Sequence, residues 1–229
     1  MAGPGRVRGI SANLWQPPIM QTLLPVLMIG LFVGVFALTI AFAIRQQKRG
    51  RENLVRLAQT LGLPVPESSR GFFSRMSAPT ISGTFKGRPL RLFTYTTGSG
   101  KHRVAWCALA VTVLNPGGLT LKVGRENLLT RAGRIFGVED ISTGDTTFDE
   151  QFYLKSNDAG YTRAAFIREV RLQFIEVWKN GARGAVQVDG ADVKYAEQGS
   201  FSSDKTCARF PAMADLACMV ADVVEARGR

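Results

Sequence analysis

A run of 22 uncharged residues near the amino terminus constrains this chain more than any other feature. Residues 23–44 read LLPVLMIGLFVGVFALTIAFAI and contain no charged side chain. At about 1.5 Å of rise per residue, a helix of this length spans about 33 Å, enough to cross a hydrocarbon core of about 30 Å. Because hydrocarbon offers no partners to backbone groups, the segment must be helical there. The sequence therefore predicts one transmembrane helix, preceded by a tail over residues 1–22.

Four small residues recur on one side of this predicted helix. Gly30 and Gly34 form a G-x-x-x-G pair, and Ala37 and Ala41 continue it at further spacings of three and four. Such spacings place all four residues on one helix face, where another helix can approach closely. We therefore predict that Gly30, Gly34, Ala37 and Ala41 form a helix-packing face that contacts other transmembrane helices. The alternative is that Gly and Ala are simply frequent in membrane helices.

Basic residues on the two sides of the span predict its orientation. Arg6 and Arg8 precede it, whereas a larger basic cluster follows it closely: Arg45, Lys48, Arg49, Arg51 and Arg56. The positive-inside rule places the larger cluster in the cytoplasm. We therefore expect a protein of the bacterial inner membrane, with its N-terminus outside and its C-terminal domain cytoplasmic. The larger cluster is also predicted to contact anionic lipid headgroups.

A cleaved signal sequence is the alternative to a permanent anchor. Ala41-Phe42-Ala43 resembles the small-residue site at which signal peptides are cut. However, the apolar run is longer than the about 7–15 residues of a signal peptide, and basic residues follow it directly. Both features favour a span that stays in the protein.

The formal net charge of +11 is unevenly distributed. Residues 1–51 contain six basic residues and no acidic one, whereas residues 137–229 contain fifteen acidic and eleven basic residues. The basic excess lies in the part of the chain next to the span, where anionic lipid accounts for it. No recognition motif accompanies it, so we expect no nucleic-acid partner. The three scattered cysteines, Cys107, Cys207 and Cys218, fit a reducing compartment better than a disulfide framework.

Beyond the span, the order of elements predicts an α+β fold with a largely antiparallel sheet and several helices. We expect a juxtamembrane helix over residues 45–62, a linker over 63–79 and a soluble domain over 80–229. Strands are expected at residues 80–86, 90–97, 103–114, 119–123, 151–155, 185–188 and 191–196. Helices are expected at residues 126–136, 161–180 and 203–226, with Pro211 kinking or splitting the last. Five large side chains are predicted to lie in the core: Phe148, Phe152, Phe166, Phe174 and Trp178.

No motif for catalysis or cofactor binding is complete in this sequence. Residues 97–102, TGSGKH, resemble the end of a phosphate-binding loop, but Tyr95 stands where its first glycine belongs and His102 where Ser or Thr belongs. A hairpin tip is the better interpretation. His102 is the only histidine, and no carboxylate lies near it in sequence to orient it as a base. We therefore expect no cofactor and assign no catalytic residue.

An acidic loop at residues 138–150 is the one candidate for a divalent cation. It offers carboxylates, the ligands that Ca²⁺ and Mg²⁺ prefer, but at spacings that match no EF-hand. The candidates are Glu139, Asp140, Asp145, Asp149 and Glu150. A solvated loop is the simpler interpretation, and no metal site is assigned.

Residues 144–164 carry an F-D-x-x-F strand entry, then an apolar–Lys–Ser–Asn/Asp stretch and an Ala/Arg-containing helix. The positions that form this pattern are Phe148, Asp149, Phe152, Leu154, Ser156, Asp158, Arg163 and Ala164. The pattern resembles bacterial single-span, membrane-anchored domains of unknown function. That resemblance implies a bacterial origin and an α+β domain, and it supplies no catalytic residue.

Three hypotheses for the function follow. The first is a non-enzymatic accessory or scaffolding subunit, whose helix packs against other helices of a respiratory or photosynthetic type of membrane complex while its domain covers the cytoplasmic face. The second is a membrane-tethered sensor or ligand-binding domain that acts as a homodimer through Gly30 and Gly34. The third is a metal-dependent, membrane-anchored enzyme that uses the acidic loop.

Overall fold

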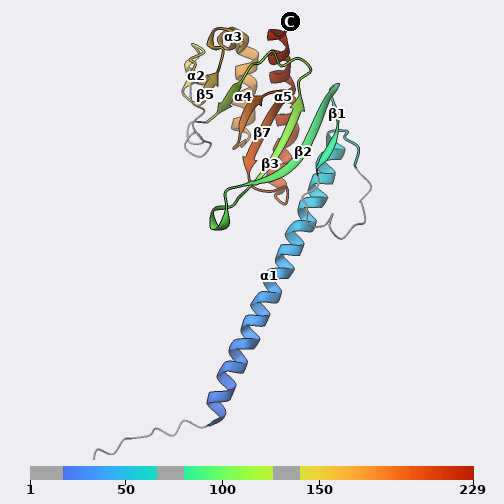
Figure 1. Ribbon diagram of the computed structural model, residues 1–229, viewed down its shortest axis with the longest axis vertical. Coiled ribbons are helices and arrows are strands. Elements are labelled where there is room, and N and C mark those ends of the chain that lie inside the picture. The colour runs from blue at the N-terminus through green and yellow to red at the C-terminus, as the bar shows by residue number, and fades with distance from the viewer. Residues whose placement is uncertain (1–17, 66–79, 126–139) are drawn as a thin grey trace, which may run out of the picture. The chain divides into compact units, whose positions relative to one another are not determined.

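The computed structural model describes residues 18–65, 80–125 and 140–229 (Figure 1). The chain forms two compact units, residues 1–45 and 46–229. Helix α1, Pro18–Thr60, continues through the boundary between them. The expected helix at residues 126–136 and most of the expected linker lie outside the described residues.

A Schellman motif ends helix α1. Gly62 has a φ of +67°, the left-handed conformation that glycine adopts most easily. The N–H of Leu63 donates to the carbonyl of Ala58 (2.8 Å), and the N–H of Gly62 donates to that of Gln59 (3.0 Å). Leu63 is buried, so the motif turns the chain directly into the core. The helix itself ends at Thr60, two residues before this glycine.

Seven strands form a single antiparallel sheet, and the α+β fold class is confirmed. They are β1 Ile81–Phe85, β2 Arg88–Thr97, β3 Val104–Thr112, β4 Leu121–Gly124, β5 Tyr153–Ser156, β6 Ala185–Asp189 and β7 Asp192–Gln198. Their order across the sheet is β1-β2-β3-β7-β6-β4-β5. The C-terminal hairpin β6–β7 therefore lies between β3 and β4 (Figure 1). Each strand overlaps its expected range.

The first hairpin turns one residue earlier than expected. Lys86 and Gly87 have positive φ values of +49° and +77°, as a two-residue turn of type I′ requires. Arg88 lies between the strands expected at residues 80–86 and 90–97, but in the structure it begins β2 and forms an ion pair with Glu225 of helix α5, Asp204–Arg227.

One face of the sheet carries the core. The register aligns Leu92 with Leu109 and Tyr195, and all three are fully buried against the helical layer. The alternate positions form the second face, where Tyr95 and Trp106 are only partly buried. This alternation follows from the two-residue period of a strand. Helix α4, Arg168–Lys179, and α5 lie together in the helical layer (Figure 1).

The single helix expected at residues 161–180 is wrong. The structure has two helices there, α3 Ala159–Ala165 and α4, separated at Phe166 and Ile167. Ile167 has an extended ψ of 169°, which redirects the chain. Phe166 is fully buried between the rings of Phe148 and Phe174. Core packing of this side chain therefore overrides the continuous helical pattern of the sequence.

Two further expectations are corrected. The acidic loop is not devoid of regular structure, because Thr146–Asp149 forms a one-turn helix, α2, capped by Asp145. Of the two outcomes expected at Pro211, a kink or a split, the split is wrong, because α5 continues through the proline. The proline removes one N–H from the helix, but Phe210 and Met213 beside it are fully buried and hold both flanking turns in the core.

The predicted aromatic core is confirmed. Phe148, Phe152, Phe166, Phe174 and Trp178 are each at most 4% exposed. Their ring centroids lie 4.9 to 6.3 Å apart in successive stacked, tilted and edge-on contacts. Burying each such side chain contributes about 1.5–3 kcal/mol, which makes this cluster a main source of the domain's stability.

Candidate functional site

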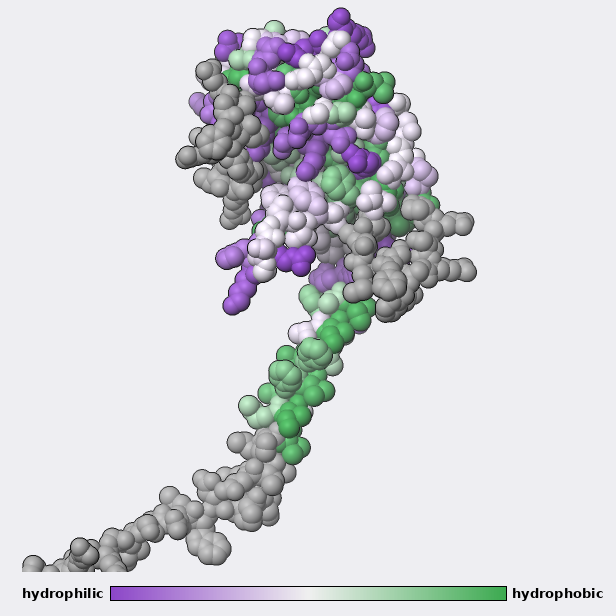
Figure 2. All heavy atoms as spheres, viewed as in Figure 1, coloured by the Kyte–Doolittle hydropathy of each residue, from purple (hydrophilic) through white to green (hydrophobic). Residues whose placement is uncertain are grey.

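The predicted helix-packing face lies open along α1. A Cβ atom built on Gly30 or Gly34 meets no heavy atom within 4 Å. Ala37 and Ala41 follow on the same helix and are exposed. The large apolar side chains described for this segment, from Val26 to Ile44, are 46–73% exposed. Figure 2 shows this segment as a continuous hydrophobic surface. A long apolar helix that stays exposed in this way fits a membrane anchor.

The predicted lipid-contacting residues Arg45, Lys48, Arg49, Arg51 and Arg56 are all exposed. Among them, Lys48 alone makes an ion pair with a described residue, to Glu52 at 3.9 Å. Both side chains of that pair are more than half exposed, and such pairs contribute little to stability. The structure therefore leaves this basic stretch available to an external partner.

The C-terminal part of α1 belongs to the domain core. Leu54, Leu57, Ala58 and Leu61, the positions with helical spacing in the sequence, are at most 5% exposed. Polar contacts add to this packing, because the side-chain amide of Asn53 donates to the carboxylate of Asp204 at 2.7 Å. The juxtamembrane helix is thus an integral element of the domain.

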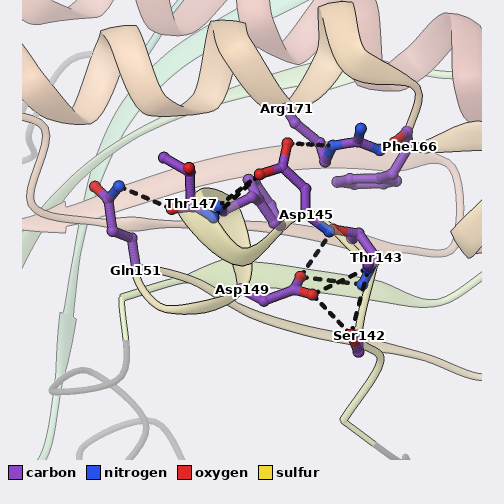
Figure 3. A network of polar contacts seen from close by, with 10 residues as sticks. Ser142, Thr143, Asp145, Thr147, Asp149, Gln151, Phe166 and Arg171 are labelled. Carbon is purple, nitrogen blue, oxygen red and sulfur yellow. Dashed lines mark hydrogen bonds and ion pairs between the residues drawn. The ribbon is translucent and has the colours of Figure 1, made fainter.

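In the acidic loop, the two central carboxylates are occupied by hydrogen bonds from the loop itself (Figure 3). Asp149 accepts from the hydroxyl groups of Ser142 (2.7 Å) and Thr143 (2.8 Å) and from the N–H groups of Thr143 (3.0 Å) and Gly144 (3.1 Å). Partial burial raises the pKa of Asp149, but the hydrogen bonds from Ser142, Thr143 and Gly144 together outweigh it and lower this pKa below its ordinary value. The carboxylate therefore stays ionised and holds the loop closed.

Asp145 connects the same loop to helix α4. One of its oxygens accepts from the N–H groups of Thr147 (3.1 Å) and Phe148 (3.3 Å), which caps α2. The other accepts from Nε of Arg171 at 3.1 Å (Figure 3). These contacts assign the two aspartates a structural role.

The remaining acidic candidates are dispersed. Asp140 forms an ion pair with Lys155 at 3.5 Å, Glu150 is exposed, and Glu139 lies outside the described residues. Within residues 18–65, 80–125 and 140–229, no group of three or more His, Cys, Asp or Glu side chains is arranged to hold a metal ion.

A buried polar network, which the sequence analysis missed, connects β7 to α5. Tyr195 and Glu197 are at most 1% exposed. The Tyr195 hydroxyl donates to Glu197 at 2.6 Å and accepts from the N–H groups of Arg183 (3.3 Å) and Gly184 (3.2 Å). Arg209 forms an ion pair with the other Glu197 oxygen at 2.5 Å. Burial raises the pKa of Tyr195 well above its ordinary value, so the hydroxyl keeps its proton. The hydrogen bonds and the ion pair of this network connect the sheet to the helix, although Nε of Arg209 is buried without a hydrogen-bond partner.

The cysteines are free thiols with no sign of reactivity. Cys107 and Cys218 are buried, and Cys207 is partly exposed. Burial raises the pKa of Cys107 to about 12 and that of Cys207 to about 11. The nucleophilic thiolate form is therefore scarce at neutral pH.

The segment that resembles a phosphate-binding loop is a hairpin tip. Residues 98–103 connect β2 to β3, with a 3₁₀ turn at Gly100–His102. Lys101, His102 and Arg103 are all exposed. No helix follows this segment, so it lacks the helix N-terminus that would bind a phosphate in such a loop.

Neither a protein-family model nor a curated protein sequence matches this chain. Among solved structures, the chain is similar to the crystal structure of the mycobacterial trehalose monomycolate transport factor A, TtfA. The TM-score is 0.51 at 10% sequence identity, over 77% of this chain and 94% of that chain. At this identity the similarity is one of fold.

Proposed function

We propose that this chain is a non-enzymatic, single-pass protein of the bacterial inner membrane that serves as an accessory factor of a larger membrane assembly. Its domain lies in the cytoplasm. The face made of Gly30, Gly34, Ala37 and Ala41 contacts helices of the assembly, and the basic stretch from Arg45 to Arg56 contacts anionic lipid headgroups.

The observation that carries this proposal is the exposed apolar helix joined without interruption to the domain core. The first part of α1 has a face open to close helix approach, and its last turns are buried among the core residues. An element built in this way serves both as anchor and as scaffold. The internal hydrogen bonding of Asp145 and Asp149 argues against an enzyme that uses them.

The fold neighbour favours one kind of assembly. TtfA is a mycobacterial trehalose monomycolate transport factor. We therefore propose that the assembly transports envelope lipids or glycolipids, in preference to a respiratory or photosynthetic complex. The chain would act beside the transporter and would not itself perform chemistry.

The test is co-purification of the full-length chain through a C-terminal tag. Native membranes are extracted in mild detergent, separated on a native gel and analysed by mass spectrometry. We expect a large species with a fixed ratio of this chain to a polytopic transport protein. A monomer without partners would contradict the proposal, and a pure homodimer would favour the membrane-tethered sensor instead.

Orientation is tested separately. A C-terminal green fluorescent protein folds in the cytoplasm, whereas a C-terminal alkaline phosphatase is active only outside. We expect fluorescence from the first fusion and no activity from the second. The opposite pattern would place the domain outside and exclude the proposed arrangement.

A further inference from the structure

Within the domain, the part of helix α1 that follows residue 45 runs along the strand direction, so that its start and its end contact different ends of the sheet. Near its start in the domain, Gly50 approaches Ser202, since a Cβ built there lies 3.5 Å from the Ser202 nitrogen. After its last turn, Leu63 approaches Gly83 of β1, at 3.1 Å from a Cβ built there. Gly83 pairs with Leu90 near the start of β2, whereas Ser202 follows the end of β7. The two contacts therefore lie at opposite ends of the sheet.

The β2–β3 hairpin tip lies at the end where α1 enters. β7 pairs with β3 as far as Gln198 opposite Trp106, and the N–H of Gly199 then donates to the carbonyl of Ala105 at 3.0 Å. The tip, residues 98–103, follows directly beyond these pairs (Figure 1). We call this the tip end, and the end with the turn at Lys86 and Gly87 the far end.

Covalent geometry brings the tip end close to the membrane surface if α1 spans the bilayer. The predicted span ends at residue 44 and Gly50 follows six residues later, so that even a fully extended chain would separate them by at most about 20 Å. The loop that contacts Gly50 is bonded to the base of the tip through Gly199 and Ala105. The tip is therefore within reach of lipid headgroups.

Basic side chains at the far end are neutralised by ion pairs, whereas those of the tip are not. At the far end, Arg88 is paired with Asp222 and Glu225, and Arg227 is paired with Asp158. At the tip, Lys101 and Arg103 make no ion pair with any residue in the described ranges, and both are exposed. Two uncompensated cations on a projecting turn complement an anionic surface.

The tip also has a fixed shape and an aromatic base. Gly98 has a φ of +80°, and a Cβ built on it would lie 2.3 Å from the carbonyl oxygen of His102, so the turn depends on this glycine. At its base Tyr95 and Trp106 stack with centroids 6.1 Å apart, and Trp106 donates its indole N–H to Thr97 at 2.8 Å. Partly exposed Trp and Tyr beside cations are typical of residues at a membrane interface.

We propose that the β2–β3 tip is a second binding site for anionic lipid headgroups, with Lys101 and Arg103 as the contacting side chains. This inference rests on the proposed function only in requiring that α1 spans the membrane. Together with the basic stretch on α1, the tip gives the domain two separate points of contact with the lipid surface. Two points fix the orientation of a tethered domain, which a single point does not.

The test uses the full-length chain in nanodiscs of phosphatidylcholine, with or without about a third phosphatidylglycerol. Hydrogen exchange of a peptide that covers residues 98–103 reports contact of the tip. We expect exchange to slow about fivefold for each cation engaged when phosphatidylglycerol is present, and the slowing to disappear at high salt. Because the sample contains no partner protein, slowing reports lipid alone.

Two variants with the same change in net charge make the result specific. Lys101→Glu/Arg103→Glu should abolish the slowing that depends on phosphatidylglycerol. The control, Arg168→Glu/Arg229→Glu, changes exposed residues away from the tip and should retain it. Arg229 is the last residue and follows α5. Arg168 is the first residue of α4, and the opposite end of α4 leads into β6, which starts with Ala185 at the tip end. Arg168 therefore lies away from the tip.

Three outcomes distinguish the claims. If the tip of the native chain exchanges equally in both kinds of nanodisc, the inference is wrong even though the anchor stands. If both variants lose the slowing, the effect reports net charge and the tip is not a site. If alkaline carbonate releases the chain from membranes, α1 is not a span and the proposed function fails first.

Discussion

Asn53 on α1 donates a 2.7 Å hydrogen bond to Asp204 at the start of α5, 151 positions later in the chain. Asn53 is buried, and the bond joins α1 to the last helix of the fold. The contact makes the juxtamembrane helix part of the folding unit.

Replacing Asn53 by Ala should therefore destabilise the domain. We expect the free energy of unfolding to fall by about 1–2 kcal/mol, because a partly buried hydrogen bond to a charged group is lost. Urea denaturation of the full chain in detergent measures this. Gln59→Ala, an exposed change on the same helix, should shift the value by less than about 0.5 kcal/mol. Equal effects of the two variants would show that the bond contributes nothing.

Gly184 precedes β6 at a point where no side chain fits. A Cβ built there would lie 2.1 Å from the carbonyl oxygen of Ala196 and 2.6 Å from the ring of Tyr195. Gly184→Ala should therefore cost more than about 3 kcal/mol or prevent folding, since backbone would have to move. Gly160→Ala is the matched control, because its nearest atom is 3.9 Å away and it lies in α3. It should leave the melting temperature unchanged or raise it.

Glu225 makes the stability of the domain depend on pH. Its hydrogen bonds with Arg88 and with the N–H of Leu114 lower its pKa from 4.5 to about 2. Because the pKa is lower in the folded state than in the unfolded one, the stabilisation is complete above about pH 5 and is lost as the pH falls toward 2. Thermal melts at successive pH values should show this loss.

Glu225→Gln should remove part of that dependence. The variant should be less stable at neutral pH and should lose less stability than the native chain between pH 5 and pH 2. Glu176→Gln, an exposed change on α4, should follow the native profile. If Glu225→Gln also follows it, another acidic group is responsible for the dependence.

The small-residue face of α1 can be tested by filling it. Gly30→Ile/Gly34→Ile adds bulk where another helix would approach and should abolish co-migration with the proposed assembly. Thr39→Ile/Ala43→Ile adds bulk to the opposite side of the same helix, at 100° per residue, and should retain it. Both variants should still fractionate with membranes. Retained co-migration of the first variant would exclude this face as the contact.

The sequence was sufficient where burial follows one simple period. Leu54, Leu57, Ala58 and Leu61 repeat as a helix does, and they are buried as expected. The seven strands were found because turn residues separate short apolar runs, such as the Asp189-Gly190 pair before β7. These features depend only on neighbours in sequence.

Sequence patterns were insufficient where contacts between residues far apart in the chain determine the local structure. The break at Phe166 depends on the positions of Phe148 and Phe174, which no local pattern contains. Glu197 follows the apolar part of its strand, yet it is buried because Arg209 of α5 forms an ion pair with it. The tip end was likewise not predictable, because it depends on which strands become neighbours in the sheet.

The position of the β6–β7 hairpin also has a consequence for the order of synthesis. β3 ends at Thr112, but its partner β7 begins only at Asp192, and β4 likewise waits for β6. Until the last quarter of the chain has left the ribosome, the inner edges of β3 and β4 have no strand to pair with. By then the apolar part of α1, near the amino terminus, has already left the ribosome and is available for insertion into a membrane. If α1 is the proposed membrane anchor, the nascent chain is tethered to the membrane before it can complete its sheet, while the edges of β3 and β4 are still unpaired and open to aggregation.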